Sequence, residues 1–505
     1  MIKSDLSPGW RGKYFTKPVS DALLLAGSLL VISLLMVPYV SNGYWYDDAL
    51  NSQIHAFLHR VDGSLGDFSY RVVMHWLQQE GRLMLGFFYG YAGFYFINDL
   101  ETLRLVHGLL IVTNIALYGY MLKLLGARNS FVAIWAILLV GLFQIHGRGL
   151  DPVAGFAFHY PLLGIQLSIT LILFVKWVEQ KSLHYLHMSL SIWLLSMLCY
   201  EANFIFIPIA FAVMYISDSR NKRYPWLLLI GAMSLYLGLA FYLKSQAVGG
   251  TYAGTSFGEV SKMLPAYFKQ LSATFPLASY LAATHQSLQI GALFNEMISS
   301  ALAWAVFISS LIIIKTSIST NATKLVIRRE AILISVGMLL LPAVFPAISL
   351  RYQNEVGWGV GTLPVYYQSF GLAFLLAWAV SGIQKGKAFQ TVVPVIISCY
   401  LALNVTMNTS MANSVDAFWR EPRETLIDQA RAGLFDQVRE GDIVHTVNVA
   451  HYINANLIYE GSGKRVYVPT DDHAWYPEAP GEAAKSFELT RNEAGKYEIV
   501  QRQAK

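Results

Sequence analysis

Long apolar stretches recur along most of this chain, and they constrain its fold more than any other feature. The first runs from Asp21 to Val40, and others of similar length follow at intervals. Roughly 20 apolar residues in an α-helix cross the hydrocarbon core of a bilayer, which is about 30 Å thick. With 55% hydrophobic and only 14% charged residues, the chain carries more apolar surface than a soluble core could bury. We therefore expect an all-α polytopic membrane protein.

The apolar segments predict about 11 membrane-spanning helices. They are expected near residues 20–40, 102–123, 130–147, 160–177, 185–200, 203–217, 225–243, 296–315, 331–349, 366–383 and 389–407. The two cysteines, Cys199 and Cys399, both fall inside predicted spans and are expected to be packing residues.

Basic residues predict the orientation, because lysine and arginine in short loops mark the cytoplasmic side. They fill the N-terminus and every second connection: Lys3, Arg11, Lys13, Lys17, Lys123, Arg128, Lys176, Lys181, Arg220, Lys222, Arg223, Lys315, Lys324, Arg328, Arg329, Lys385 and Lys387. The N-terminus is therefore expected inside and the C-terminus outside, with the first span kept as a signal anchor. Since these residues form no basic stripe, the net charge of +5 indicates no nucleic-acid partner.

The domain organisation follows from this orientation. Residues 1–407 are predicted to form the membrane domain, with an outer juxtamembrane loop at 49–100 and a second outer loop at 244–295. Leu83 to Asn98 is apolar, but counting it as a span would place the basic loops outside, so we expect interfacial helices there. Residues 408–505 are more polar and predict a small extracytoplasmic α/β domain, with a helix at 423–435 and strands at 442–449 and 465–469.

Polar residues that do not suit a lipid-facing helix all fall on the predicted outer side. They are Asp47, Asp48, Glu80, Arg82, His146, Arg148, Asp151, His159, Glu201, Arg351, Tyr352, Gln353, Tyr366, Tyr367 and Gln368. Ionisable groups at membrane depth are costly and often mark a substrate path. The adjacent carboxylates Asp47 and Asp48, directly after the first span, are the strongest candidates, because two such groups repel each other unless they bind a cation, a proton or a substrate hydroxyl.

Each candidate also has an ordinary structural interpretation. The acidic pair could be a solvated helix end, and Glu201 could cap the helix that follows it. Arg82 with Glu80 could form an exposed ion pair, and Arg351 could extend its side chain to lipid headgroups. His146 and His159 are more often hydrogen-bonded loop residues than ligands, Asp151 before Pro152 suits a turn, and the tyrosines suit an interfacial belt. No nucleotide-binding, HExxH or CxxC motif occurs.

The order of these features resembles the GT-C superfamily of integral membrane glycosyltransferases. The acidic pair Asp47-Asp48 followed by Trp76 and Gly81-Arg82 is similar to the N-terminal region of O-antigen glucosyltransferases that modify lipopolysaccharide. The resemblance covers roughly residues 20–380, and its motifs are short. It implies a GT-C-like fold with the familiar acidic positions at Asp47, Asp48 and Asp151. No proline-rich motif precedes the apolar part of the first loop, unlike the protein-mannosylating and lipid-A-modifying branches.

The resemblance and the outer polar residues together predict an inverting glycosyltransferase of the bacterial inner membrane, with its site facing the periplasm. It would move a sugar from a polyprenyl-phosphate donor to a hydroxyl of a cell-envelope glycan or glycolipid. Asp48 is the expected general base, and Asp47 or Asp151 would orient it or hold a divalent cation such as Mg²⁺ or Mn²⁺. Whether a metal is needed stays open.

The remaining candidates take substrate-binding roles in this hypothesis. Arg351 or Arg82 would hold the leaving phosphate, and Arg148 is a further candidate for it. Glu201 and the tyrosines, Tyr367 among them, would line the sugar pocket, and Glu80, His159, Tyr352 and Gln353 would complete the site. Three other functions remain alternatives: a transporter or lipid-linked sugar flippase, a glycan polymerase or ligase, and a non-catalytic assembly subunit. A flippase is disfavoured because the spans carry few internal charges and no inverted repeat is visible.

Overall fold

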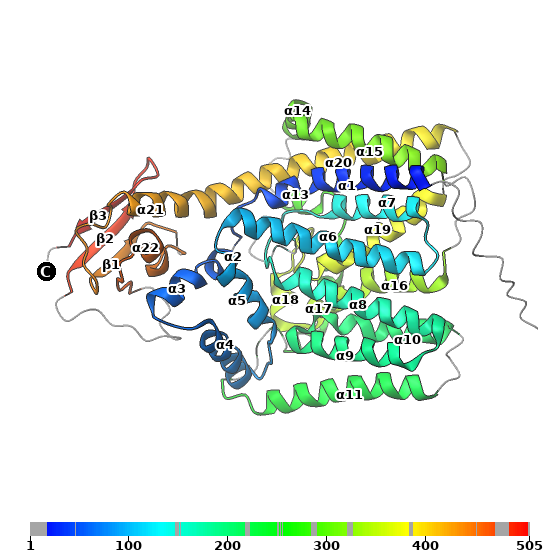
Figure 1. Ribbon diagram of the computed structural model, residues 1–505, viewed down its shortest axis with the longest axis horizontal. Helices are drawn as coiled ribbons and strands as arrows, with labels where there is room; N and C mark the ends of the chain where they lie inside the picture. The colour runs from blue at the N-terminus through cyan, green and yellow to red at the C-terminus, as the bar shows by residue number, and fades with distance from the viewer. Residues whose placement is uncertain are drawn as a thin grey trace, which may run out of the picture.

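The computed structural model describes residues 18–45, 47–146, 151, 153–217, 223–249, 252, 254, 256–283, 290–320, 327–382, 387–450, 452–469 and 484–502. Most of these residues are helical (Figure 1). The helices are α1 (Pro18–Val40), α2 (Asp47–Asn51), α3 (Ile54–Arg60), α4 (Leu65–Glu80), α5 (Gly86–Phe96), α6 (Leu100–Leu124), α7 (Asn129–Leu142), α8 (His159–Gln180), α9 (Leu183–Cys199), α10 (Phe206–Ile216), α11 (Arg223–Ser245), α12 (Val260–Ser272), α13 (Ala278–Ala283), α14 (Ile290–Ser299), α15 (Ala301–Thr320), α16 (Arg329–Leu340), α17 (Val344–Ile348), α18 (Leu350–Glu355), α19 (Val365–Gly382), α20 (Lys387–Val415), α21 (Glu421–Arg431) and α22 (Ala455–Ser462).

Seven of the described helical segments are long and apolar enough to cross a membrane, judged by length and composition. They are Asp21–Val40, Leu100–Leu124, His159–Gln180, Arg223–Ser245, Ala301–Ile318, Arg329–Ile348 and Phe389–Arg431. The long helices run side by side along one direction of the molecule (Figure 1). The structure therefore agrees with a polytopic helical membrane protein.

The prediction of 11 spans is not settled by these helices. Three predicted spans correspond to shorter apolar helical segments, Asn129–Leu142, Leu183–Cys199 and Glu201–Ile216. The first has 14 residues, and at a rise of about 1.5 Å per residue it is shorter than a bilayer core of about 30 Å. A fourth predicted span corresponds to α19, which has 18 residues. Eleven spans and their orientation therefore stay predictions.

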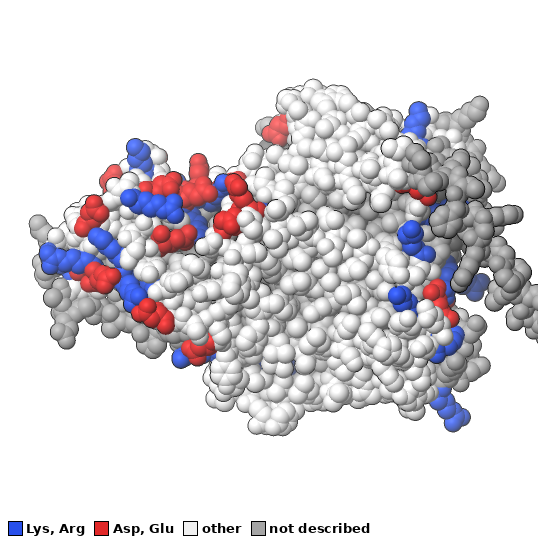
Figure 2. Space-filling model, in the orientation of Figure 1, with Lys and Arg blue, Asp and Glu red and all other residues white. Residues whose placement is uncertain are grey.

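On the face that Figure 2 draws, charged residues gather at the two ends of the molecule and leave a nearly uncharged belt between them. Lysine and arginine are prominent at the end opposite the C-terminal sheet. Such a belt suits lipid, because apolar side chains facing a bilayer need no polar cover. The belt coincides with the long parallel helices of Figure 1.

We expect the end of the molecule that carries the C-terminal sheet to lie outside the cytoplasm. Alkaline phosphatase fused after Arg431 should be active and the same enzyme fused near Arg223 inactive, because lysine and arginine bias keeps the loop before α11 inside. Phosphatase activity in whole cells gives the readout. An active fusion near Arg223 would reverse the orientation and with it the outer placement of the acidic pair.

The predicted boundary between residues 407 and 408 falls inside a continuous helix. α20 is followed directly by a π-helical turn, Asp416–Arg420, and then by α21. No proline or glycine interrupts residues 395–421. Pro422 has no N–H to donate to the preceding turn, and the π-helical turn lies directly before it. The polar C-terminal region is thus joined to the membrane part by an unbroken helical rod.

The C-terminal region contains a three-stranded sheet in the order β1 (Ile443–Val447), β2 (Ser486–Arg491) and β3 (Tyr497–Gln501). β1 pairs with β2 in parallel and β2 with β3 in antiparallel fashion. The predicted strand at 465–469 forms only a single bridge, from Tyr467 to Ile443. The predicted helix at 423–435 corresponds to α21, which ends four residues earlier, at Arg431.

Where the structure describes them, the loops at 49–100 and 244–295 contain helices joined by turns and irregular segments. α2 to α5 lie in the first and α12 to α14 in the second. α5 has 11 residues, so it is too short to cross a bilayer at about 1.5 Å per residue. α2 to α5 lie at the end of the bundle that carries the C-terminal sheet (Figure 1).

Candidate functional site

The acidic pair opens α2, the short helix that follows the first span. The Asp48 backbone N–H donates to the Trp45 carbonyl oxygen at 2.7 Å, which turns the chain sharply between the two helices. The Asp48 side chain is completely buried, whereas that of Asp47 is partly exposed. Two neighbouring carboxylates therefore meet different surroundings, an arrangement that separates their pKa values.

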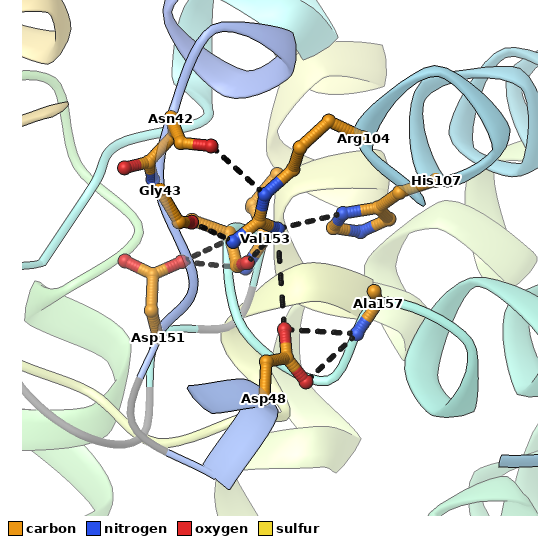
Figure 3. A network of polar contacts seen from close by, with 9 residues as sticks. Asn42, Gly43, Asp48, Arg104, His107, Asp151, Val153 and Ala157 are labelled. Atoms are coloured by element: carbon orange, nitrogen blue, oxygen red, sulfur yellow. Dashed lines mark hydrogen bonds and ion pairs between the residues drawn. The ribbon is translucent and has the colours of Figure 1, made fainter. Parts of the chain in front are cut away.

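Arg104, on α6, is the nearest cation to Asp48. Its Nη1 lies 3.9 Å from Asp48 Oδ2, and both side chains are fully buried (Figure 3). Arg104 also donates to the carbonyl oxygens of Asn42 at 3.2 Å, Gly43, and Ala154 at 2.7 Å. One guanidinium thus joins the segment before the acidic pair to the loop before α8. α6 begins two residues after Asn98, where the Asp99 side chain accepts the Thr102 N–H at 2.7 Å as an N-cap.

The environment of Asp48 raises its pKa from 3.8 to about 7. Loss of hydration on burial is the main cause, since it penalises the charged carboxylate. The Arg104 guanidinium and the Ala157 N–H, which lies 3.4 Å from both carboxylate oxygens, act in the opposite direction. A carboxyl group with such a pKa can exchange a proton near neutral pH, which an ordinary aspartate cannot.

Asp151 organises the neighbouring loop. Its Oδ2 accepts the His146 N–H at 2.6 Å, and its Oδ1 accepts the N–H groups of Val153 at 2.8 Å and Ala154 at 2.5 Å. This carboxylate is fully buried, and three backbone donors occupy its oxygens. It therefore holds the loop whose Ala154 carbonyl accepts a hydrogen bond from Arg104, the partner of Asp48.

Asp48 and Asp151 do not direct their oxygens at a common point in this arrangement. Asp151 directs both oxygens at backbone N–H groups, and Asp48 faces Arg104 and the Ala157 N–H. Among the residues that the structure describes, no three His, Cys, Asp or Glu side chains lie together in a way that could hold a metal ion. We therefore assign no step to Mg²⁺ or Mn²⁺.

A cavity of about 340 Å³ opens in front of the acidic pair. Six of the residues proposed from the sequence line it: Asp47, Asp48, Arg82, His159, Arg351 and Tyr352. They come from α2, α8, α18 and the loop after α4, which lie far apart along the chain. Aromatic residues form much of the remaining wall, including Trp76, Phe87, Tyr91, Tyr200 and Tyr252. Acidic, basic and aromatic side chains thus meet around one space large enough for a small polar ligand.

Arg82 is fixed at the cavity wall by a bidentate ion pair. Its Nε and Nη2 donate to the two carboxylate oxygens of Glu201 at 2.6 and 2.5 Å. Its guanidinium carbon also lies 5.0 Å from the centre of the Tyr200 ring and 5.1 Å from that of Tyr252. Gly81 makes the turn that directs Arg82 inward, because its φ of +62° suits glycine and a Cβ there would meet Lys244 Cα at 2.7 Å.

Arg351 faces the cavity from α18 and is less enclosed. Its Nη1 donates to the Tyr252 hydroxyl, and its Nε donates to Glu355 at 2.6 Å. That ion pair is partly exposed, so solvent weakens it. Arg351 also lowers the pKa of Asp47, although burial of that carboxyl outweighs the effect and leaves its pKa raised.

The other described residues proposed from the sequence do not line the cavity, although Glu201 reaches its wall through Arg82. Glu80 ends α4 and does not line it. Gln353 joins α18 to the chain before α12, since its Nε2 donates to the Glu259 carbonyl oxygen at 3.0 Å. The Tyr367 hydroxyl donates to Asn203 at 3.0 Å inside the helical core. Arg148 lies outside the described residues.

Arg104 is the most important residue that the sequence reasoning missed. A single arginine inside an apolar span is a signal in itself, because a charge at that depth is costly and needs a partner. The partner, Asp48, is 56 residues away in the chain, so no local pattern joins the two. Tyr252 was missed as well, because it stands in a glycine-rich stretch that carries no motif.

A scan with protein-family models found no match to this chain, and a search of the curated proteins found none either.

Proposed function

We propose that this protein is an inverting glycosyltransferase that moves a sugar from a polyprenyl-phosphate donor to a hydroxyl group of a cell-envelope glycan or glycolipid. The reaction would take place at the outer face of the bacterial inner membrane, as in O-antigen modification of lipopolysaccharide. The single observation that carries the proposal is the Asp48 carboxyl. It is buried, its pKa is about 7, and it lines the same cavity as Arg82 and Arg351.

The proposed chemistry is a single displacement at the anomeric carbon. The ionised Asp48 accepts the proton of the acceptor hydroxyl as that oxygen attacks. The new carbon–oxygen bond forms on the face opposite the leaving group, and the bond from the anomeric carbon to the phosphate oxygen breaks with its electron pair. The products are the glycosylated acceptor and polyprenyl phosphate, so the anomeric configuration inverts and no cofactor is consumed.

Arg351 is the better placed of the two arginines to receive the phosphate. Glu201 already compensates the charge of Arg82 through two short hydrogen bonds. The partner of Arg351, Glu355, is partly exposed and lies four residues away on the same helix. Ion pairs of this kind contribute about 0.3–0.5 kcal/mol to stability. The donor phosphodiester, with its single negative charge, can displace so weak a partner, and the polyprenyl phosphate monoester that leaves gains a second negative charge that Arg351 would stabilise.

Replacing Arg351 with lysine should weaken handling of the lipid-linked donor. Lysine keeps the positive charge but loses the planar fork that binds two phosphate oxygens at once. We expect a higher KM for the donor, measured with a purified polyprenyl-phosphate sugar at fixed acceptor concentration. Lys262→Arg, an exchange on an exposed helix, serves as the control. A parental KM in Arg351→Lys would make Arg351 a headgroup anchor and leave the phosphate to Arg82 or Arg148.

The transfer rate should rise with pH through the pKa of Asp48, about 7. The general base works only when it is deprotonated, so the protonated form that prevails at lower pH is inactive. The adjacent Asp47 titrates in the same cavity, and the profile therefore reports the pair. kcat measured at saturating donor gives this profile. A rate that stays flat across neutral pH would remove Asp48 as the base.

The function itself is tested by incubating purified protein with a panel of polyprenyl-phosphate sugars and envelope glycans. We expect release of polyprenyl phosphate from at least one donor, together with a product of inverted anomeric configuration. Retained configuration would contradict the single displacement. Absence of cleavage across the whole panel, by protein shown to bind the donors, would contradict glycosyl transfer.

A further inference from the structure

α12 carries a stripe of apolar side chains that no described part of the chain covers. Val260 is 80% exposed, Leu264 64% and Phe268 49%. Residues four apart lie on the same side of an α-helix, so these three form one continuous face. The stripe extends to Phe257, just before the helix, which is also highly exposed.

The other two sides of α12 have different chemistry. Ala266 and Gln270 are buried, and Gln270 donates to Gln368 at 2.9 Å and accepts the Thr362 N–H at 2.9 Å. Lys262 and Lys269 lie on roughly the opposite side from the apolar stripe, because successive residues turn by about 100°. α12 therefore has one side packed on protein, one apolar side, and one side that carries Lys269 and Lys262, of which Lys262 pairs with Glu259 at 2.7 Å.

α12 also lies beside the end of a candidate membrane span. The Gly258 N–H donates to the carbonyl oxygen of Ile348 at 2.8 Å, and Ile348 is the last residue of the span Arg329–Ile348. The highly exposed Trp358 stands at the other end of α12, next to Gly359, whose N–H donates to Ser272 Oγ at 2.8 Å. Tryptophan is enriched where apolar and aqueous surroundings meet at a membrane surface.

We propose that α12 is an interfacial membrane helix that rests in the bilayer next to the end of the span Arg329–Ile348. Its apolar stripe lies among the acyl chains, and Lys262 and Lys269 face the headgroups and water. A lysine-bearing side opposite a Phe, Leu and Val side is typical of helices that lie in the plane of a membrane. A soluble partner or a second copy of the chain would need no lysine-bearing side in this position.

Hydrogen bonds of the segment just before α12 connect this helix to the wall of the cavity. The Leu350 N–H donates to the Ser256 carbonyl oxygen at 2.9 Å, and Ser349 Oγ donates to that of Gly254 at 2.8 Å. Arg351 and Tyr352 follow directly on α18. In the proposed arrangement, α12 therefore holds the side of the cavity that carries Arg351 and Tyr352 at a fixed distance from the membrane surface. The inference rests on α12 and its neighbours Ile348 and Trp358, and it does not depend on the reaction proposed for the cavity.

A spin label attached at position 264 tests the proposal in reconstituted vesicles. Leu264→Cys is made in a Cys399→Ala background, because Cys199 is buried. Val500→Cys is the matched control, since Val500 is an equally exposed apolar residue, at 63%, on β3 of the C-terminal sheet. We expect dissolved oxygen to relax the label at 264 more strongly than an aqueous nickel chelate does, and the reverse at 500.

Two outcomes would overturn the proposal. A label at 264 that meets the nickel chelate as freely as the label at 500 would place the stripe in water. A label shielded from both reagents would mean that protein covers the stripe, as in a dimer. Phe268→Cys lies on the same face and gives the same readout where Leu264→Cys does not fold.

Discussion

Replacing Asp48 with asparagine is expected to lower sugar transfer by on the order of a hundredfold or more. Asparagine keeps the size of the side chain, and its oxygen can still accept the Ala157 N–H, but it cannot take up a proton. The fold should persist, because Arg104 keeps its three carbonyl acceptors and Asp48, with a pKa of about 7, is already protonated in part of the parent molecules near neutral pH. Transfer is measured as kcat with a lipid-linked donor, and donor binding by the variant should stay close to that of the parent.

The matched control for this variant is Asp67→Asn. Asp67 is an exposed acid on α4 that pairs with Arg71 at 2.8 Å and has no part in the buried network around Asp48. It should leave transfer unchanged. Turnover by Asp48→Asn within a few-fold of the parent would show that Asp48 takes no proton from the acceptor, and the acidic pair would then be a structural feature of the helix end.

Replacing Arg104 with methionine is expected to cause the largest loss of stability. The substitution leaves the carbonyl oxygens of Asn42, Gly43 and Ala154 without their donor and the Asp48 carboxyl without its cation. Removing one partner of a buried ion pair costs about 3–5 kcal/mol. Thermal unfolding in detergent should therefore show a clear decrease in Tm. Arg71→Met, which removes an exposed pair worth about 0–1 kcal/mol, is the control.

A second readout separates the effect of Arg104 on Asp48 from its effect on the fold. Arg104 lowers the pKa of Asp48, so its loss should raise that pKa further above 7. The rising part of the pH–rate profile should then move to higher pH in Arg104→Met and less so in Arg104→Lys, which keeps the charge. An unchanged profile in a folded Arg104→Met protein would mean that Arg104 only holds the backbone together.

The sequence was informative about the helices because the bilayer sets their length and apolar character directly. The segments ending at Val40 and beginning at Leu100 or His159 are all present as long apolar helices. Helices such as α7 were predicted too long, because the apolar run continues past Leu142 while the helix itself ends there. β2 and β3 were missed, since short strands in a polar region give a weak pattern compared with a membrane span.

The site was harder to predict than the fold, because it depends on contacts between distant parts of the chain. Asp48 and Arg351 could be proposed as ionisable residues at the ends of spans, and both line the cavity. Asp151 was also proposed from the sequence, yet its oxygens are occupied by the backbone of its own loop. Nothing in the local sequence distinguishes a carboxylate that folds a loop from one that faces a cavity. Arg104 needs the folded protein to reveal its partner.

The central claim is that Asp48 takes part in breaking the bond between a sugar and a polyprenyl phosphate. The most direct measurement compares the parent and Asp48→Asn in sealed proteoliposomes that carry one labelled donor, and follows both the free polyprenyl phosphate and the side of the membrane on which the donor lies. We predict that the parent cleaves the donor and glycosylates the acceptor, whereas the variant binds the donor and leaves it intact. Movement of intact donor across the bilayer by the parent, without cleavage, would contradict this account and indicate a flippase.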